Sequence, residues 1–242
     1  MFAIRCFGDA VLGVPTQSVD FSTHPDLPSI IAKMMGTLRD KGGVGIAANQ
    51  CADIPAPAPS IIIVGVADEE TRSKAQLRYP NLVIPDAHIL INPVIIAKSI
   101  ETLFLKTGEG CLSVPCSFRG KVLRHHTVVV QYQDIHGKPF ERELTELQSY
   151  IVQHECDHLH GIVIIHKLLH DMLPEQRHEF VTLIDAVLAD PLPADQRPKV
   201  PTIAMDRDAD GFVKINVDLI IATLSDLDQS VLLALKRAAL DL

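Results

Sequence analysis

The sequence has no excess of positive charge. Its 242 residues include 22 lysines and arginines against 30 aspartates and glutamates, which gives a formal net charge of -8 at pH 7. A protein whose main function is nucleic-acid binding contacts phosphates through clustered lysine and arginine side chains. The charge balance argues against such a surface as the main function, and we expect no direct binding to nucleic acid.

Cysteines are few, and they do not form a recognisable disulfide framework. The five are Cys6, Cys51, Cys111, Cys116 and Cys156. Their number is odd and their spacings are irregular, unlike those of a disulfide-stapled domain. A reducing cytoplasm is the simpler interpretation, in which any special cysteine binds a metal or reacts.

Long apolar runs are also missing. No stretch approaches the roughly 20 apolar residues that span a bilayer, and the first residues show neither a signal core nor transit-peptide character. Hydrophobic residues make up 47% of the chain and charged residues 21%, as in soluble globular proteins. We therefore expect a cytoplasmic protein with no membrane partner.

Hydrophobic periodicity predicts a mixture of helices and strands. Apolar residues recur at helical spacing from Ile30 to Leu38, and Gly42 ends the pattern. The polar stretch 67–88 contains two prolines and predicts a long surface loop. Short apolar runs predict strands over residues 61–66, 89–96, 127–133 and 139–144. The mixed order indicates an α+β fold.

The best-defined helix start is predicted at Thr145. This residue is a good N-cap, and Gln148 completes a capping-box pattern. Gly161 is placed to end the helix, and the β-branched run 162–165 indicates an extended segment after it. Another helix is predicted to open at Pro174.

A C-terminal extension, residues 190–242, is predicted to follow a catalytic domain of residues 1–189. Residues 190–198 are rich in proline and predict a linker. Residues 206–211 imitate the start of a calcium-binding loop, but position 12 of that loop would be a valine, so a polar turn between two strands is preferred. A last amphipathic helix is predicted from about Ser225.

One five-residue pattern indicates the chemistry. In His154-Glu-Cys-Asp-His158 the two histidines are four residues apart, so both imidazoles lie on one helical face and reach one ion. Glu155 can then act as a general base toward water at that ion. Taken alone, the pattern also fits a surface helix with two unrelated histidines.

A catalytic metal site needs a third protein ligand and an open position for water. A metzincin would have histidine at position 164, which is isoleucine here. Glu179 lies near the distance that other metallopeptidases use, but the 162–165 run separates it from the helix. Cys111 remains as a candidate, because a thiolate with two imidazoles suits Zn²⁺ or Fe²⁺. By itself, however, such a cysteine is more often a small buried side chain.

Three separate motifs resemble those of the peptide deformylase family and occur in the family's order. They are Gly43-Val-Gly-Ile-Ala-Ala-Asn-Gln50, Glu109-Gly-Cys-Leu-Ser113 and Gln153-His-Glu-Cys-Asp-His158. The resemblance implies mixed and antiparallel sheets packed around a central metal-binding helix. It also implies a metal-dependent hydrolase that removes the N-formyl group from N-formylmethionyl peptides of newly made proteins and releases formate.

The resemblance assigns roles to individual residues. The implied metal ligands are Cys111, His154 and His158. Glu155 is the acid and base, and the Gln50 side chain and Leu112 backbone N–H stabilise the oxyanion. The implied substrate-binding residues are Val44, Gly45, Glu109, Leu147, Tyr150 and Ile151.

The same resemblance implies a cofactor and partners. One divalent ion per chain is expected, commonly Fe²⁺ in the cell, with Zn²⁺ or Ni²⁺ able to occupy the site; the ligands alone do not choose between them. N-formylated nascent peptides are the expected substrates, with a transient ribosome contact.

The chain departs from the family pattern on the ligand helix. Glu146 stands where the family usually has glycine, Ser149 where it has alanine, and Tyr150 where it has a smaller aliphatic residue. The Tyr150 ring either narrows the methionine pocket or packs in the core with its hydroxyl at water. Two alternatives stay open: a broader metallopeptidase with Glu179 at the metal, and a binding protein with a narrowed pocket.

Overall fold

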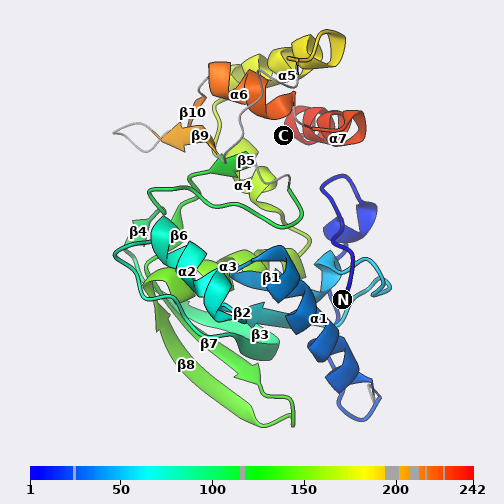
Figure 1. Ribbon diagram of the computed structural model, residues 1–242, viewed down its shortest axis with the longest axis vertical. Helices are drawn as coiled ribbons and strands as arrows, with labels where there is room; N and C mark the ends of the chain where they lie inside the picture. The colour runs from blue at the N-terminus through cyan, green and yellow to red at the C-terminus, as the bar shows by residue number, and fades with distance from the viewer. Residues whose placement is uncertain (24–25, 115–117, 194–201, 208–212, 216, 226) are drawn as a thin grey trace. The chain divides into compact units, whose positions relative to one another are not determined.

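The computed structural model describes residues 1–23, 26–114, 118–193, 202–207, 213–215, 217–225 and 227–242 (Figure 1). These residues form two compact units. The first contains residues 1–5, 10–103 and 123–162, and the second contains residues 6–9, 104–122 and 163–242. Helices alternate with mostly antiparallel strands, which confirms the predicted α+β class.

The first unit is built on a five-stranded antiparallel sheet (Figure 1). In spatial order its strands are β1 (Gly45–Ala47), β2 (Ile61–Val64), β3 (His88–Lys98), β7 (Thr127–Gln133) and β8 (Pro139–Thr145). The four predicted strands are all present, because their β-branched and apolar residues suit a half-buried pleated surface. β1 and β8 are the edges of the sheet.

The ligand helix α3 (Glu146–Leu159) packs against β1 and β2. Its predicted end is confirmed: Gly161 has φ 77°, and its N–H donates to the His158 carbonyl at 3.0 Å. Thr145 is the N-cap residue, but its side chain makes no capping hydrogen bond. The helix start is therefore where the sequence predicted it, while the predicted capping box is wrong.

The other elements of the first unit are shorter or lie at its surface. They are η1 (Ala10–Gly13), α1 (Leu27–Lys41), η2 (Ala48–Gln50), α2 (Glu69–Arg78), β4 (Thr102–Leu103) and β6 (Arg124–His125). The helix predicted around Ile30–Leu38 is confirmed as α1, and Gly42 ends it with φ 61°.

Helix α2 shows that the predicted long loop after β2 is wrong. The Asp68 carboxylate accepts the Thr71 N–H at 2.8 Å, which caps the helix, and Glu70 pairs with Lys74 one turn later. Only two residues of α2 are buried. The helix therefore has no apolar stripe, and hydrophobic periodicity gave no sign of it.

Glu146, the first residue of α3, has φ 49°. A side chain with a Cβ rarely adopts this left-handed conformation, which costs roughly 1–2 kcal/mol. We expect the Glu146→Gly variant to be more stable than Glu146→Ala by about 1 kcal/mol, because both lose the carboxylate and only glycine relieves the strain. Urea denaturation of the two variants measures this difference. Equal stabilities would contradict the expectation.

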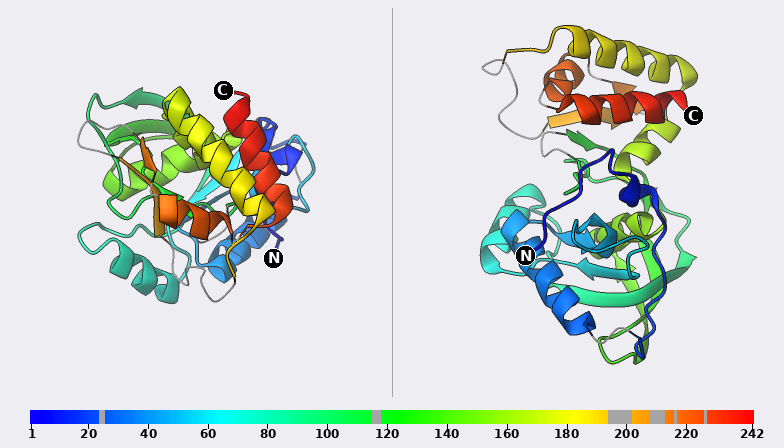
Figure 2. Two further views of the ribbon diagram at one scale, coloured as in Figure 1. Left: turned by 90° about the horizontal axis from the view of Figure 1, so that it is seen from above. Right: turned by 90° about the vertical axis from the view of Figure 1, so that its right-hand side faces the viewer.

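The second unit contains a three-stranded sheet in the order β10-β9-β5. Its strands are β5 (Phe118–Gly120), β9 (Thr202–Arg207) and β10 (Val213–Ile215). β9 runs parallel to β5 and antiparallel to β10. Its helices are α4 (Ile164–His170), α5 (Pro174–Ala189), α6 (Val217–Leu224) and α7 (Gln229–Leu240). Helices α5 and α7 run side by side (Figure 2).

Several predictions for the second unit need correction. The predicted extended segment over 162–165 is wrong beyond Val163, because α4 begins at Ile164. Residues 163–165 are all buried, so hydrophobic periodicity does not distinguish a strand from a helix there. Helix α6 was not expected. The last helix begins at Gln229 with Asp228 as its N-cap residue, after the predicted start near Ser225.

Parts of the extension lie outside the described residues. The predicted linker runs into the undescribed stretch 194–201, and the predicted polar turn falls largely on 208–212. Strands β9 and β10 flank that turn as expected. The division into residues 1–189 and 190–242 stays a prediction. Among the described helices, none is long and apolar enough to cross a membrane.

Candidate metal centre

Two histidines share one face of α3. His154 and His158 are one turn apart, and their ring centroids are separated by 5.1 Å. Both residues are buried. The helical repeat predicted from the sequence thus brings two imidazoles together.

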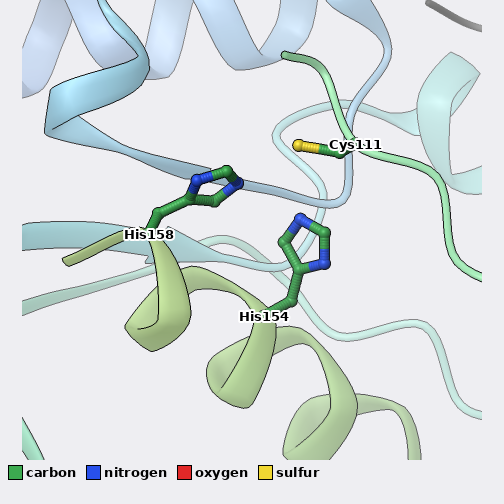
Figure 3. A group of neighbouring side chains, drawn as sticks. All are labelled: Cys111, His154 and His158. Carbon is green, nitrogen blue, oxygen red and sulfur yellow. The ribbon is translucent and has the colours of Figure 1, made fainter. Parts of the chain in front are cut away.

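Cys111 completes a group of possible metal ligands. One ligand atom from each of Cys111, His154 and His158 can be chosen so that all three lie within 4.8 Å of one another (Figure 3). Metal–sulfur and metal–nitrogen bonds are about 2.3 and 2.0–2.1 Å long, so one ion fits between them. A thiolate with two imidazoles suits Zn²⁺ or Fe²⁺ and leaves a coordination position open for water.

Glu179, the alternative third ligand, does not join this group. It lies on α5, and its side chain is exposed. Within the described part of the chain, Cys111, His154 and His158 are the one group of three neighbouring histidine, cysteine or carboxylate side chains that could hold a metal ion. This geometry disfavours the broader metallopeptidase.

Glu155 lies on α3 beside a glycine of the edge strand β1. Its side chain is buried. A Cβ at Gly45 would collide with the Glu155 carboxylate and would lie 2.7 Å from the Ile151 side chain. Only glycine therefore lets β1 approach the helix so closely. Three residues named from the sequence, Gly45, Ile151 and Glu155, are brought together here.

The Gln50 side chain has a defined orientation. Its Oε1 atom accepts the Ala47 N–H at 2.8 Å, and the residue is 1% exposed. Because the carbonyl end of the amide is used in this way, the NH₂ end points the other way as a donor. That orientation is what an oxyanion-stabilising role requires.

Asn49 holds the C-terminal end of the ligand helix and was given no role from the sequence. Its Nδ2 donates to the backbone carbonyl of His158 at 2.5 Å, and the residue is fully buried. A hydrogen bond at this carbonyl fixes the backbone that carries a candidate ligand. The only sequence signal was its place beside Gln50 in the first motif.

Further polar side chains of α3 form hydrogen bonds with the backbone of β6. Ser149 Oγ and Gln153 Nε2 both donate to the His125 carbonyl at 2.8 Å, and Gln153 Oε1 accepts the His125 N–H at 3.0 Å. Arg124 forms an ion pair with Asp157 at 2.5 Å, and its side chain is almost completely buried. Ser149, a departure from the family pattern, thus has a structural partner.

The remaining residues named from the sequence differ in how far they are buried. Leu147, Tyr150 and Ile151 are all buried on α3. Glu109 is buried, while Val44 and Leu112 are half-buried. The Val44 carbonyl accepts the Gly65 N–H at 2.7 Å.

Two other cysteines are unsuited to nucleophilic chemistry. Burial raises the pKa of Cys51 and that of Cys156 to about 12. Both thiols therefore stay protonated near neutral pH and are poor nucleophiles. A structural role is predicted for Cys156, which is buried, and for Cys116, which lies outside the described residues.

Together, the fold and the site define a metal-dependent hydrolase with both histidines and an adjacent glutamate on one helix. The chain belongs to the polypeptide deformylase family, whose model matches residues 1–172. It is 32% identical over 175 residues to peptide deformylase 2 of Shewanella oneidensis, covering 72% of this chain and 86% of that one. It is 30% identical over 163 residues to the peptide deformylase of Streptococcus pyogenes serotype M49, covering 67% and 74%.

Solved structures agree with this membership. The actinonin-bound class I type b peptide deformylase of Acinetobacter baumannii matches with a TM-score of 0.57 and 29% identity, over 69% of this chain and 97% of that one. The Plasmodium falciparum enzyme matches with a TM-score of 0.54 and 31% identity, over 68% and 85%.

The activity predicted from the resemblance is confirmed at the level of the family. The protein is a peptide deformylase-type hydrolase that removes the N-formyl group from nascent peptides. The family is metal-dependent, and the Cys111, His154 and His158 group offers a site for the metal.

Proposed function

We propose that Cys111, His154 and His158 bind one divalent ion and that Glu155 carries the proton during deformylation. The observation that supports this most is the close approach of the three ligand atoms, within 4.8 Å. When bound, the ion supplies Lewis acidity, which lowers the pKa of water and polarises the formyl carbonyl.

Glu155 acts twice in this proposal. Its carboxylate first accepts a proton from the water that adds to the formyl carbon. As the carbon–nitrogen bond breaks, it returns the proton to the departing amine, leaving formate and a free N-terminus. Burial of Glu155 behind Gly45 keeps the carboxylate in one place, which favours both transfers.

Two donors stabilise the negative charge that develops on the formyl oxygen. We assign them to the NH₂ group of Gln50 and the backbone N–H of Leu112. Preorganised donors aimed at developing charge are often the largest catalytic contribution. The hydrogen bond from Ala47 to Gln50 Oε1 supports this role, because it sets which end of the amide donates.

The substrate peptide is proposed to bind along the edge strand β1, near Val44 and Gly45. An edge strand presents backbone groups with which an extended peptide can pair. Leu147, Tyr150 and Ile151, together with Glu109, are assigned to the substrate side chain and its surroundings. The Acinetobacter baumannii deformylase has been solved with Met-Ala-Ser bound, and we propose formyl-methionyl peptides as the substrates here.

The expected substrate, a nascent peptide, also indicates where in the cell the enzyme works. Nascent chains emerge in the cytoplasm, so we place the enzyme there with a transient ribosome contact. We propose Fe²⁺ as the ion in the cell, with Zn²⁺ or Ni²⁺ able to replace it. Residues 1–189 would form the catalytic domain, and residues 190–242 the extension.

Formate release from formyl-Met-Ala-Ser tests the proposal directly. Protein purified without oxygen should contain about one ion per chain and should release formate from this peptide. Apoprotein reconstituted separately with Fe²⁺, Zn²⁺ or Ni²⁺ compares the three ions. Cleavage of internal peptide bonds by metal-loaded protein that releases no formate would favour a metallopeptidase instead.

Replacing Tyr150 tests its assignment to the side-chain pocket. If the ring lines the pocket, Tyr150→Ile should raise kcat/KM for formyl-Met peptides about tenfold relative to formyl-Ala peptides, because space for a longer side chain is gained. The matched control is Tyr150→Phe, which keeps the ring and should leave the ratio unchanged. A Met-to-Ala ratio that Tyr150→Ile does not alter would place the ring outside the pocket.

A further inference from the structure

The segment that leads to Cys111 is paired with strand β5. Glu109 and Gly120 exchange two backbone hydrogen bonds, of 2.8 and 3.1 Å. Glu109 precedes Cys111 by only two residues. The backbone position of the thiolate therefore depends on where β5 lies.

The Arg119 side chain adds a second connection between β5 and this segment. Its guanidinium is buried and donates to the carbonyls of Thr107 and Gly108, at 2.9 and 2.5 Å. A Cβ at Gly110 would lie 2.7 Å from one of its nitrogens. The guanidinium thus packs directly against the residue before Cys111.

The C-terminal extension pairs with the other edge of β5. Gly120 is the register partner of Met205 in the parallel strand β9, and the Lys121 N–H donates to the Met205 carbonyl at 3.0 Å. Successive residues of a strand direct their backbone groups to opposite edges. The backbone N–H and carbonyl of Gly120 therefore bond with Glu109, while the backbone N–H of Lys121 bonds with β9. β5 thus lies between the Glu109 segment and β9.

Arg207, at the end of β9, connects this strand to the residue after β5 and to α4. Its Nε donates to the Lys121 carbonyl at 2.8 Å, and the same guanidinium forms an ion pair with Asp171 at the C-terminal end of α4. The Arg207 side chain is almost completely buried. Lys121 forms a further ion pair with Asp206 at 2.5 Å. The residue directly after β5 is thus held by three groups of the extension.

We propose that the C-terminal extension positions the Cys111 thiolate for the metal, through β9 and β5, and that Arg207 is the positioning residue. β5 has three residues, and a ribbon of two short strands is only marginally stable alone. The third strand, supplied by the extension, fixes β5 and with it the Glu109–Cys111 segment. This inference rests on the proposed role of Cys111 as a ligand.

Metal affinity and the cysteine–metal bond of the full-length protein test the inference. In Arg207→Ala, the Kd for Co²⁺, measured by competition with a chelator, should rise about tenfold, as for other residues that orient ligands. The thiolate-to-cobalt charge-transfer band should weaken or shift. Asp171→Asn, which keeps the shape of the Arg207 partner, should change both readouts in the same direction to a smaller extent.

Leu235→Ala is the matched control. Leu235 is buried on α7 of the same extension and takes no part in the β9–β5 pairing. At a temperature at which all variants are folded, it should leave the Kd and the band unchanged. An unchanged Kd and band in both Arg207→Ala and Asp171→Asn would overturn the inference. An equal loss of affinity in Leu235→Ala would also overturn it, because general destabilisation would then be the cause.

Cys111→Ala separates this inference from the proposed function. Loss of the charge-transfer band in Cys111→Ala, with the band intact in the Arg207 and Asp171 variants, would leave Cys111 as a ligand and refute only the positioning role. A band and Kd unaffected by Cys111→Ala would refute the proposed ligand set, and the inference with it.

Discussion

Replacing Glu155 with alanine should leave metal binding intact and lower kcat on the order of 10³-fold, the range in which general acid–base groups contribute. Glu155 is adjacent to a ligand but is not a member of the ligand group. Its removal therefore takes away the proton carrier and leaves the cysteine and both imidazoles in place. Formate release from formyl-Met-Ala-Ser and the metal content of the same sample give the two quantities.

Glu155→Gln and Glu179→Ala are the controls for this result. The glutamine variant keeps the shape of the side chain beside Gly45 but does not accept a proton, so it should be nearly as inactive as the alanine variant. Glu179 is an exposed carboxylate on α5, and its loss should change neither activity nor metal content. Near-normal turnover by metal-loaded Glu155→Ala would show that another group carries the proton.

Cys111→Ala should lose most of the bound metal, because only two imidazoles would remain as strong protein ligands. Activity should fall with metal content for the same reason. Equilibrium dialysis against Zn²⁺, followed by metal analysis, measures the affinity of the wild-type protein and the variant. If Cys111→Ala kept a full complement of metal while Glu179→Ala lost it, the metallopeptidase ligand set would be the correct one.

The sequence predicted best those parts of the site that depend on local spacing. His154 and His158 come together because helical geometry places residues four apart on one face. Glu155 follows from the same helix. The third ligand was different: Cys111 is distant in the chain, and Glu179 was disfavoured only because residues 162–165 were predicted to be extended, although α4 begins at Ile164. The resemblance to a family pointed to Cys111, and the geometry then grouped it with the histidines.

Predictions failed where helices lack an amphipathic pattern. Helix α2 is polar on almost every side, so hydrophobic periodicity did not reveal it, although the Asp68 side chain caps it by accepting the Thr71 N–H. Helix α4 opens with the buried Ile164 and Ile165, which also suit a strand. Thr145 marked the start of α3 without forming the expected cap. Such local interactions compete with tertiary packing, which sequence patterns do not report.

The parallel pairing of β9 with β5 has a consequence for the order of events during biosynthesis. Residues 118–120 leave the ribosome long before their partner, residues 202–207, has been translated. Translation proceeds at roughly 5–20 residues per second, so on the order of ten seconds can separate the two strands. The three-stranded sheet therefore completes only after residues 202–207 and 213–215 have left the ribosome, well after β5 and the Glu109–Cys111 segment have emerged.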